Sequence, residues 1–346
     1  MSMRSGNLAS GNLLQRCMAE FSGAFVLAFH EISPERVAEL VESLQPFQAV
    51  HLSELVERNK QRKSISGLFA ITIDDGVGEN VRKLTQLFRA KAWPATFYIP
   101  THYVDSGESM VFQWWRWLKP LLPRRRLELS CGVIDLSTPG AVEAVSKKME
   151  LLWHTQRLES YLPMTMELAE IVLREGGLTK AAIQPAPPIT WAEVEELSKH
   201  DLIRFESHGV SHAAMSSLTE DELAFEMKHS RDLVTEHTGR RCRHLAYPFG
   251  SWQSIGMRAV AAAERWYDSA VTMSLGPVDS ANPWLLPRIP LYPENSTLVA
   301  QLKILLKCST LRPFKPERPP AWTGSGREKH RPTVHAPAGA NSREST

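Results

Sequence analysis

Short, continuously apolar runs alternate with amphipathic segments along most of the chain. The clearest runs cover 25–29 (FVLAF), 67–73 (GLFAITI) and 95–99 (ATFYI). Because neighbouring positions are all apolar, each run indicates a strand that is buried on both faces, as in a parallel sheet. Amphipathic helical patterns at 34–44 and 80–91 separate the runs. The sequence therefore predicts β-α-β units and an α/β fold.

The same alternation continues after residue 190. Two capping boxes, Thr190 with Glu193 and Thr219 with Glu222, mark the first turns of helices. Gly239 marks the end of the second of these helices. The remaining elements that we expect are strands at 48–52, 202–206, 244–247, 269–272 and 286–289, a short helix near Leu55, and helices at 220–236 and 254–265.

Three segments differ from this α/β pattern. Residues 109–190 begin with a stretch dense in Trp and Arg, show helical periodicity without strand signals, and close with a proline-rich linker at 184–188. We interpret them as an inserted helical subdomain within a catalytic domain at 21–311. Residues 1–20 are interpreted as an N-terminal extension. Residues 312–346 are rich in Pro, Gly, Ser and charge, and are expected to form a disordered tail.

Composition narrows the functional classes. The chain has 346 residues, of which 43% are hydrophobic and 23% charged, and its formal net charge is +2. This charge is too small to indicate binding to nucleic acid or to a membrane surface. The four cysteines show no close spacing, which argues against a disulfide framework and a cysteine-rich zinc site. No apolar run has the length of a signal peptide or of an integral membrane segment, so we expect a soluble cytoplasmic protein.

Asp74 and Asp75 directly follow the apolar run 67–73 and precede Gly76. Two adjacent carboxylates at the carboxyl end of a strand can divide two tasks, one binding a cation and the other accepting a proton. An Asp-Asp-Gly turn that only caps a helix is the alternative. The position at the end of a strand favours the functional interpretation.

His208 and His212 lie four residues apart, just after the strand expected at 202–206. Both imidazoles can reach one cation if the backbone between them forms a helical turn. The pair alone is a weak signal. Together with an Asp from another strand end, however, it gives a mixed oxygen and nitrogen ligand set with open positions, which is typical of catalytic metal sites.

The sequence Tyr-Pro-Phe-Gly at 247–250 also ends an expected strand. A backbone N–H in this loop is a candidate to face a developing oxyanion, and an ordinary strand-to-helix turn is the equal alternative. These motifs all fall at strand carboxyl ends, where α/β barrels and sheets build active sites.

Two further clusters are ambiguous. The aromatic residues Phe112, Trp114, Trp115 and Trp117 suit a platform for a sugar or lipid, although a role in the core of the insertion is the favoured interpretation. The arginines at 124–126 suit an anionic glycan or lipid phosphate, and equally a solvated turn.

The ordered motifs ITIDDG, ATFYIP, SHGVSH, HLAYPFG and LPRIP resemble those of the polysaccharide deacetylase family, which carries the NodB homology domain. The resemblance spans about 25–292 and is interrupted by the insertion. It implies a distorted (β/α)7 barrel, and an enzyme that removes N-acetyl groups from an amino-sugar glycan or glycolipid. The segment LAFHEIS, and the pairing of WWRWL with the ATFYIP run, also resemble a subgroup linked to exopolysaccharide and glycolipid modification.

The resemblance also implies roles for individual residues. Asp74 becomes the general base, and Asp75, His208 and His212 become ligands of a divalent metal. Phe249 takes the position whose backbone N–H faces the oxyanion. A ligand set of one Asp and two His suits Zn²⁺ best, and also Co²⁺, Mn²⁺ or Ni²⁺.

Two departures from the family pattern need replacements. An Arg that orients the base in many members corresponds here to Ala246, and Arg288 in LPRIP is our candidate for its place, because a guanidinium can hold a carboxylate through two hydrogen bonds. The late Leu-x-His motif that supplies the general acid is missing. His30, at the end of the first strand, is our candidate acid, with a structural core histidine as the alternative.

Three other functions remain as alternatives. One is hydrolysis of another carbon–nitrogen bond, in a small amide or imide, and the missing Arg and His leave room for it. Another is a glycan-binding pseudoenzyme, against which the retained Asp and His residues argue. Phosphoryl transfer is disfavoured by the histidines and by the lack of a glycine-rich phosphate loop.

Overall fold

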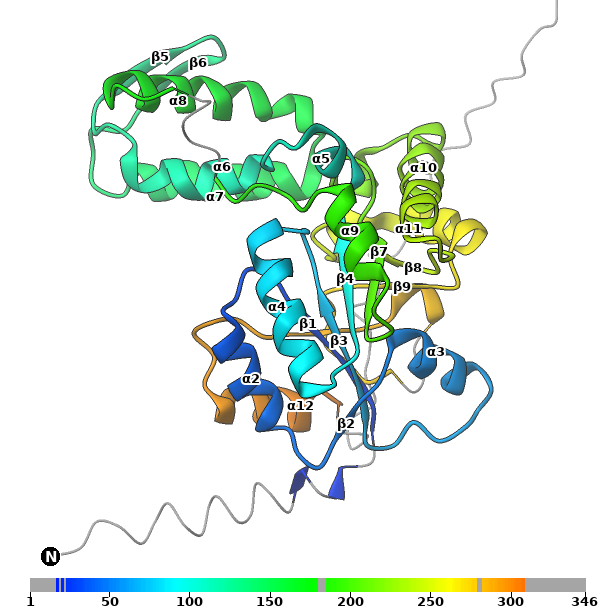
Figure 1. The fold of residues 1–346 in the computed structure, drawn as a ribbon. Helices are drawn as coiled ribbons and strands as arrows, with labels where there is room; N and C mark the ends of the chain where they lie inside the picture. The colour runs from blue at the N-terminus through cyan, green and yellow to red at the C-terminus, as the bar shows by residue number, and fades with distance from the viewer. Residues whose placement is uncertain (1–16, 19, 22, 180–184, 279–281, 309–346) are drawn as a thin grey trace, which may run out of the picture. The chain divides into compact units, whose positions relative to one another are not determined.

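The computed structural model describes residues 17–18, 20–21, 23–179, 185–278 and 282–308 (Figure 1). These residues all belong to one unit of the chain, Met1–Pro313. The extension expected at 1–20 and the linker at 184–188 lie partly outside the described residues. The tail expected at 312–346 lies wholly outside them.

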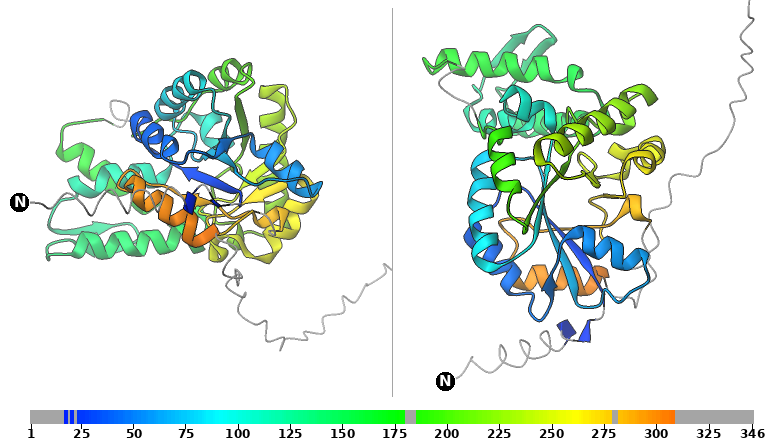
Figure 2. Two further views of the ribbon diagram at one scale, coloured as in Figure 1. Left: turned by 90° about the horizontal axis from the view of Figure 1, so that it is seen from below. Right: turned by 45° about the vertical axis from the view of Figure 1, so that its right-hand side comes forward.

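A curled sheet of parallel strands forms the centre of the described structure (Figures 1 and 2). Its order is β10-β1-β3-β4-β7-β8-β9, with β2 paired to β3 off this path. Every neighbouring pair is parallel, so the expected α/β fold with a distorted barrel is confirmed. The strands are β1 (Phe25–Phe29), β2 (Gln48–Ala49), β3 (Leu68–Ile73), β4 (Ala95–Ile99), β7 (Ile203–Ser207), β8 (His244–Ala246), β9 (Ser269–Val271) and β10 (Ile289–Pro290).

The last strand segment links the two edges of the sheet. On one side, the Leu286 N–H donates to the carbonyl of Ala270 in β9 at 2.9 Å. On the other side, Ile289 and Pro290 pair with β1. The segment 286–290 therefore closes the barrel between its last strand and its first.

Helices surround the strands because each carries one apolar side that packs on the sheet (Figure 2). Residues on one face of the strands pack against most of these helices, whereas α3 packs against the opposite face. Helix α12 was not expected from the sequence. The helices around the barrel are α2 (Pro34–Glu42), α3 (Leu52–Lys60), α4 (Gly78–Lys91), α5 (Thr101–Ser106), α9 (Trp191–Ser198), α10 (Glu220–Thr238), α11 (Trp252–Trp266) and α12 (Thr297–Cys308).

The insertion forms its own small core beside the carboxyl ends of the strands (Figure 1). Its helices are α6 (Val111–Leu118), α7 (Ala141–Thr155) and α8 (Leu162–Glu175). It also contains an antiparallel hairpin of β5 (Arg126–Leu129) and β6 (Gly132–Asp135), which was not expected from the sequence. These strands are short and charged, and in β5 only alternate residues are buried, so they lack the apolar run that marks the barrel strands.

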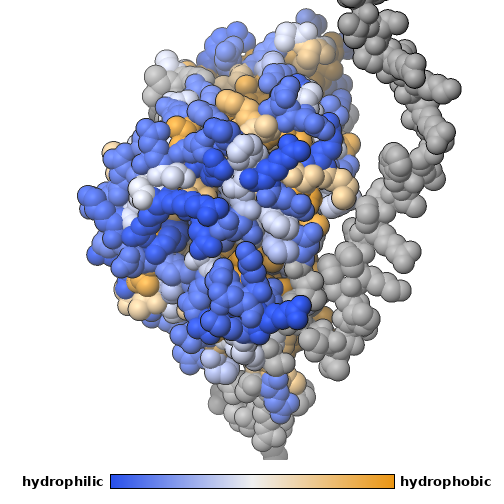
Figure 3. All heavy atoms as spheres, turned by 90° about the vertical axis from the view of Figure 1, so that its right-hand side faces the viewer, coloured by the Kyte–Doolittle hydropathy of each residue, from blue (hydrophilic) through white to orange (hydrophobic). Residues whose placement is uncertain are grey.

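The side of the molecule that carries α3, α10 and α11 is mostly hydrophilic, with apolar side chains in separate small patches (Figure 3). This agrees with helices that turn their apolar sides toward the sheet. Among the described residues, no helix combines the length and the apolar character needed to cross a bilayer.

His244 at the start of β8 is fully buried, and this predicts a pH effect on stability. Burial lowers the pKa of His244 to about 3, from an ordinary value of 6.5. Between pH 3 and pH 6.5 His244 is protonated in the unfolded chain but not in the folded chain. The free energy of unfolding therefore decreases as the pH falls below about 6.5. The expected contribution approaches about 1.4 kcal/mol per pH unit.

The measurement is the free energy of unfolding in urea between pH 7 and pH 4.5, compared with that of His244→Leu. Glu206, whose pKa burial raises to about 7, acts in the opposite direction. It is present in both proteins, so the difference between the two curves isolates His244. Parallel curves would contradict the prediction.

Candidate metal centre and active-site cavity

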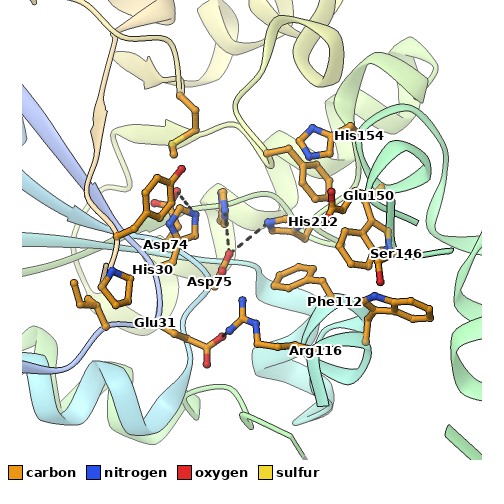
Figure 4. Close-up of a pocket in the computed structure, with 18 of the residues that line it drawn as sticks. His30, Glu31, Asp74, Asp75, Phe112, Arg116, Ser146, Glu150, His154 and His212 are labelled. Carbon is orange, nitrogen blue, oxygen red and sulfur yellow. Dashed lines mark hydrogen bonds and ion pairs between the residues drawn. The ribbon is translucent and has the colours of Figure 1, made fainter. Parts of the chain in front are cut away.

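Asp74 and Asp75 lie in a tight turn at the carboxyl end of β3. The Asp74 N–H donates to the Phe29 carbonyl at 3.0 Å, so the first aspartate still continues the strand pairing. Asp75 and Gly76 then adopt left-handed backbone conformations, with φ of 75° and 64°. A Cβ on Gly76 would approach the Ile99 side chain to 2.9 Å, so this turn requires glycine. The turn brings both buried carboxylates into the same cavity (Figure 4).

Arg288 holds the Asp74 carboxylate through two hydrogen bonds. Its Nη1 donates to Asp74 Oδ1 at 2.7 Å, and its Nη2 donates to Asp74 Oδ2 at 2.6 Å. The guanidinium is completely buried, and its other N–H groups donate to the Thr72 hydroxyl and to the Thr272 carbonyl. These two contacts fix the arginine side chain independently of its contact with the carboxylate. Arg288 thus contacts Asp74 through two hydrogen bonds, and its role as the replacement for the missing arginine stays a prediction.

This ion pair decides the charge of Asp74. Burial acts to raise the pKa of Asp74, but the Arg288 charge and hydrogen bonds outweigh it, and the pKa lies below its ordinary value. The Asp74 carboxylate in turn raises the pKa of Arg288 against the effect of burial. Asp74 is therefore an ionised carboxylate with a fixed orientation.

Asp75 faces the two histidines. Its Oδ1 lies 3.7 Å from His208 Nε2 and 3.5 Å from His212 Nε2. The histidines hold the pKa of Asp75 well below its usual value, although burial acts in the other direction. The backbone between the histidines does not form a helical turn, the one conformation considered from the sequence. Instead, Gly209 and His212 adopt left-handed conformations, with φ of 76° and 56°, and this loop turns both rings toward Asp75.

The three side chains fit a divalent metal ion. Their ligand atoms all lie within 4.8 Å of one another. Bonds of about 2.0–2.1 Å at tetrahedral angles would separate ligand atoms by roughly 3.4 Å, close to the observed distances. His208 Nδ1 lies 2.8 Å from the Ala246 carbonyl, which fixes the tautomer and leaves the lone pair of Nε2 facing Asp75. The residue types and their spacing therefore agree with a metal site.

His30 and Phe249 also line the cavity. His30 Nε2 is 3.8 Å from Asp74 Oδ2, too far for a hydrogen bond but near enough for an ion pair, and its side chain is 35% exposed. Phe249 has a left-handed backbone, with φ of 60°, and its ring lies between the rings of His212 and His154. Both residues thus line the cavity that contains Asp74 and Asp75, and their roles as acid and oxyanion donor stay predictions.

The cavity has a volume of about 630 Å³, and the insertion forms one of its walls. Figure 4 shows Phe112, Ser146, Glu150 and His154 across the cavity from His30 and Asp74. Within the aromatic cluster at 112–117, Trp114 is buried in the core of the insertion, whereas Phe112 and Trp115 also line the cavity. The contribution of α7 was not predicted, because its residue spacing is also that of an ordinary amphipathic helix.

Glu226 on α10 is a second residue that was not predicted. Its carboxylate is buried and accepts hydrogen bonds from the Val210 N–H at 2.6 Å, and from the N–H and hydroxyl of Ser211. These groups belong to the loop that joins the two histidines. Glu226 therefore fixes the backbone on which both candidate ligands depend. Glu226 lies 14 residues after His212 and belongs to no sequence motif, so the sequence alone did not indicate its role.

Glu226→Ala is expected to weaken metal binding about 10- to 100-fold, the usual effect of removing a group that orients metal ligands. The variant leaves two backbone N–H groups without an acceptor, so the loop loses its fixed shape. Competition with a chromophoric chelator measures the affinity. Glu236→Ala, an exposed site on the same helix, is the control and is expected to bind like the wild type. Unchanged affinity in Glu226→Ala would show that the loop holds its shape without this carboxylate.

Asp74 is held by an arginine and lies next to one Asp and two His that could hold a metal ion, all at strand carboxyl ends. This arrangement is typical of metal-dependent hydrolases. The sequence profile described as polysaccharide deacetylase matches residues 61–265, which is more than half of the chain. The chain belongs to this family. It is accordingly a hydrolase of carbon–nitrogen bonds in N-acetylated glycans, and it depends on a metal.

Solved structures with a similar fold are deacetylases at low sequence identity. The Streptococcus pyogenes deacetylase PplD in complex with acetate has a TM-score of 0.53 and 14% identity, and the match covers 81% of this chain and 96% of that one. The BpsB deacetylase domain from Bordetella bronchiseptica has a TM-score of 0.51 and 14% identity, with 77% and 95% covered. A de-N-acetylase from Aggregatibacter actinomycetemcomitans has a TM-score of 0.52 and 11% identity, with 81% and 99% covered.

These likenesses concern the fold. Among curated proteins, no sequence matches the chain.

Proposed function

We propose that this chain removes the acetyl group from an N-acetylated amino sugar in a glycan or glycolipid, with Asp75, His208 and His212 as ligands of Zn²⁺. The observation that carries this proposal is the juxtaposition of two differently held carboxylates. Arg288 holds Asp74 as a charged base, while Asp75 faces two imidazoles. A role in exopolysaccharide biosynthesis is part of the proposal, on the resemblance of the sequence motifs. The cytoplasmic location stays a prediction.

The reaction needs a water activated as nucleophile, a stabilised oxyanion and a protonated leaving amine. A divalent cation in this site would act as a Lewis acid on the amide carbonyl and lower the pKa of a water. Asp74 accepts the proton of the attacking water, because its ionised form is maintained by Arg288. The fixed contact with Arg288 also keeps the carboxylate oriented for this transfer.

Two further residues complete the proposed reaction. The backbone N–H of Phe249 donates a hydrogen bond to the oxyanion of the tetrahedral intermediate. His30 lies beside Asp74 at the cavity wall and donates a proton to the amine as the carbon–nitrogen bond breaks. The products are acetate and the free amino sugar.

The experiment that tests this function combines metal analysis of the purified protein with acetate release from a panel of N-acetylated glycans. His208→Ala is the matched variant, and it is expected to lose both the metal and the activity. Equal metal content in the two proteins would refute the site. Cleavage of small cyclic amides in place of the glycans would favour the alternative hydrolase. Glycan binding without acetate release would favour a pseudoenzyme.

A further inference from the structure

The wall opposite the aspartates consists of two helix sides from the insertion. Residues 112, 115 and 116 on α6, and 119 directly after it, line the cavity, and residues 146, 150, 153 and 154 along α7 do the same. Both sets follow the spacing of one side of a helix. The side that each helix presents is mixed, with aromatic rings, hydroxyl and charged groups. A helix side that served only the core of the insertion would instead be apolar.

This wall touches the residues of the proposed reaction. The Phe112 ring lies 5.1 Å from that of His212, and the His154 ring lies 4.7 Å from that of Phe249. Arg116 on α6 forms an ion pair with Glu31, which follows β1. A ligand bound to the metal centre therefore lies directly against the insertion.

The insertion is fastened to the barrel at both ends of this wall. After α7, Arg157 donates two hydrogen bonds of 2.7 Å to Glu222 at the start of α10. Where the chain returns, the Gly78 N–H donates to the Pro187 carbonyl at 2.9 Å, and the Ile189 N–H donates to the Gly76 carbonyl at 2.8 Å. The last contact joins the insertion to the turn that carries the aspartates. The wall is thus a fixed part of the site.

The charges of the wall indicate the class of ligand. Arg116 is neutralised by Glu31. Lys119 and Glu150 have opposite charges and form no ion pair with any residue that the structure describes. The cavity beyond the metal centre therefore has two cations and two carboxylates. This balance does not favour a phosphate, which would require a surplus of cations.

The aromatic residues of the wall also favour an uncharged ligand. The Phe112 and Trp153 rings contact each other edge to face, with centroids 6.3 Å apart, and both line the cavity. An aromatic surface next to hydrogen-bonding groups suits a ring that has an apolar face and hydroxyls at its edge. The cavity volume of about 630 Å³ falls within the range of roughly 300–1,000 Å³ typical of sites for drug-sized ligands, a size that a disaccharide shares.

We propose that Phe112, Lys119, Glu150 and Trp153 form a subsite for an uncharged sugar residue next to the one that loses its acetyl group. The inference rests on the proposed function, because it assumes a glycan at the metal centre. The insertion thereby makes the enzyme select oligosaccharides over a single amino sugar. Trp153 packs on the face of the neighbouring sugar, and Lys119 and Glu150 hydrogen-bond to its hydroxyls.

The test compares kcat/KM for N-acetylglucosamine and for its N-acetylated β-1,4-linked tetramer, using the metal-loaded full chain. Trp153→Ala is expected to lower the value for the tetramer about tenfold and to leave the value for the single sugar unchanged. Lys119→Ala and Glu150→Ala are expected to lower the tetramer value about three- to tenfold. These two positions lie outside the core of the insertion, so they test the subsite even if Trp153→Ala does not fold. Leu151→Ala, an exposed position on α7, is the control and should match the wild type.

Equal losses for both sugars, or none in any variant, would overturn the subsite. A preference for N-acetylglucosamine 1-phosphate that Lys119→Ala abolishes would replace it with an anion site. A second measurement, the binding of the tetramer by calorimetry, separates this inference from the proposed function. If the wild type releases no acetate but binds the tetramer, and Glu150→Ala binds it less well, the subsite stands and the proposed function fails.

Discussion

Asp74→Asn is expected to lower the rate of acetate release about 10²- to 10⁴-fold, the usual contribution of a general base. The amide has nearly the same shape as the carboxylate, but it cannot accept the proton of the attacking water. The metal content is expected to stay close to that of the wild type, because Asp74 is held by Arg288 and is not one of the three candidate ligands. Acetate release and metal analysis on the same preparation measure both quantities.

Asp75→Asn is the matched control, since it changes the neighbouring carboxylate in the same way. It is expected to lose the metal as well as the activity. The two variants therefore separate the roles that the structure suggests for two adjacent residues. An Asp74→Asn enzyme with more than about a tenth of the wild-type rate would show that another group accepts the proton.

Arg288→Met is expected to decrease the free energy of unfolding by about 3–5 kcal/mol, because it leaves the Asp74 carboxylate buried without its counterion. Both partners are almost completely inaccessible to water, with side chains 0% and 2% exposed. The same variant is expected to lose about 99% of the activity or more, since the base is no longer oriented. Denaturation by urea and acetate release measure the two effects.

The double variant with Asp74→Asn and Arg288→Met sharpens this test. Since it no longer contains a buried unpaired charge, it is expected to be more stable than Arg288→Met alone, although equally inactive. If the double variant is less stable than both single variants by the sum of their losses, the two residues act independently and the ion pair is not the cause.

The barrel strands were predictable where both faces are buried. The bounds of β1 and β4 agree with the apolar runs to the residue, because every position along them is covered by the interior of the barrel or by a helix. The hairpin β5–β6 and helix α12 were not predictable in this way. Helix α12 has apolar residues on both its buried and its exposed sides, such as Ile304 and Leu306, so helical periodicity is hidden.

The candidate site was predictable only as separate motifs. Asp75 and the histidines each follow a strand, and the parallel order of the sheet brings strand ends together. The sequence also indicated Arg288 as a partner of Asp74, although 214 positions separate them. The sequence did not indicate where the insertion lies relative to the cavity. The residues of α7 that line the cavity have no motif, and only the packing of that helix over the barrel brings them to the metal centre.

The segment 286–290, which closes the barrel, carries Arg288 and comes after all the other candidate site residues in the chain. Asp74 and all three candidate ligands precede residue 213, whereas Arg288 lies within the segment 286–290 that joins β9 to β1. A chain interrupted before this segment contains every metal ligand but lacks the group that orients the base. The side chains that could hold a metal and the side chain that orients Asp74 therefore come from different parts of the chain. Closure of the sheet by the segment 286–290 is what brings Arg288 to Asp74.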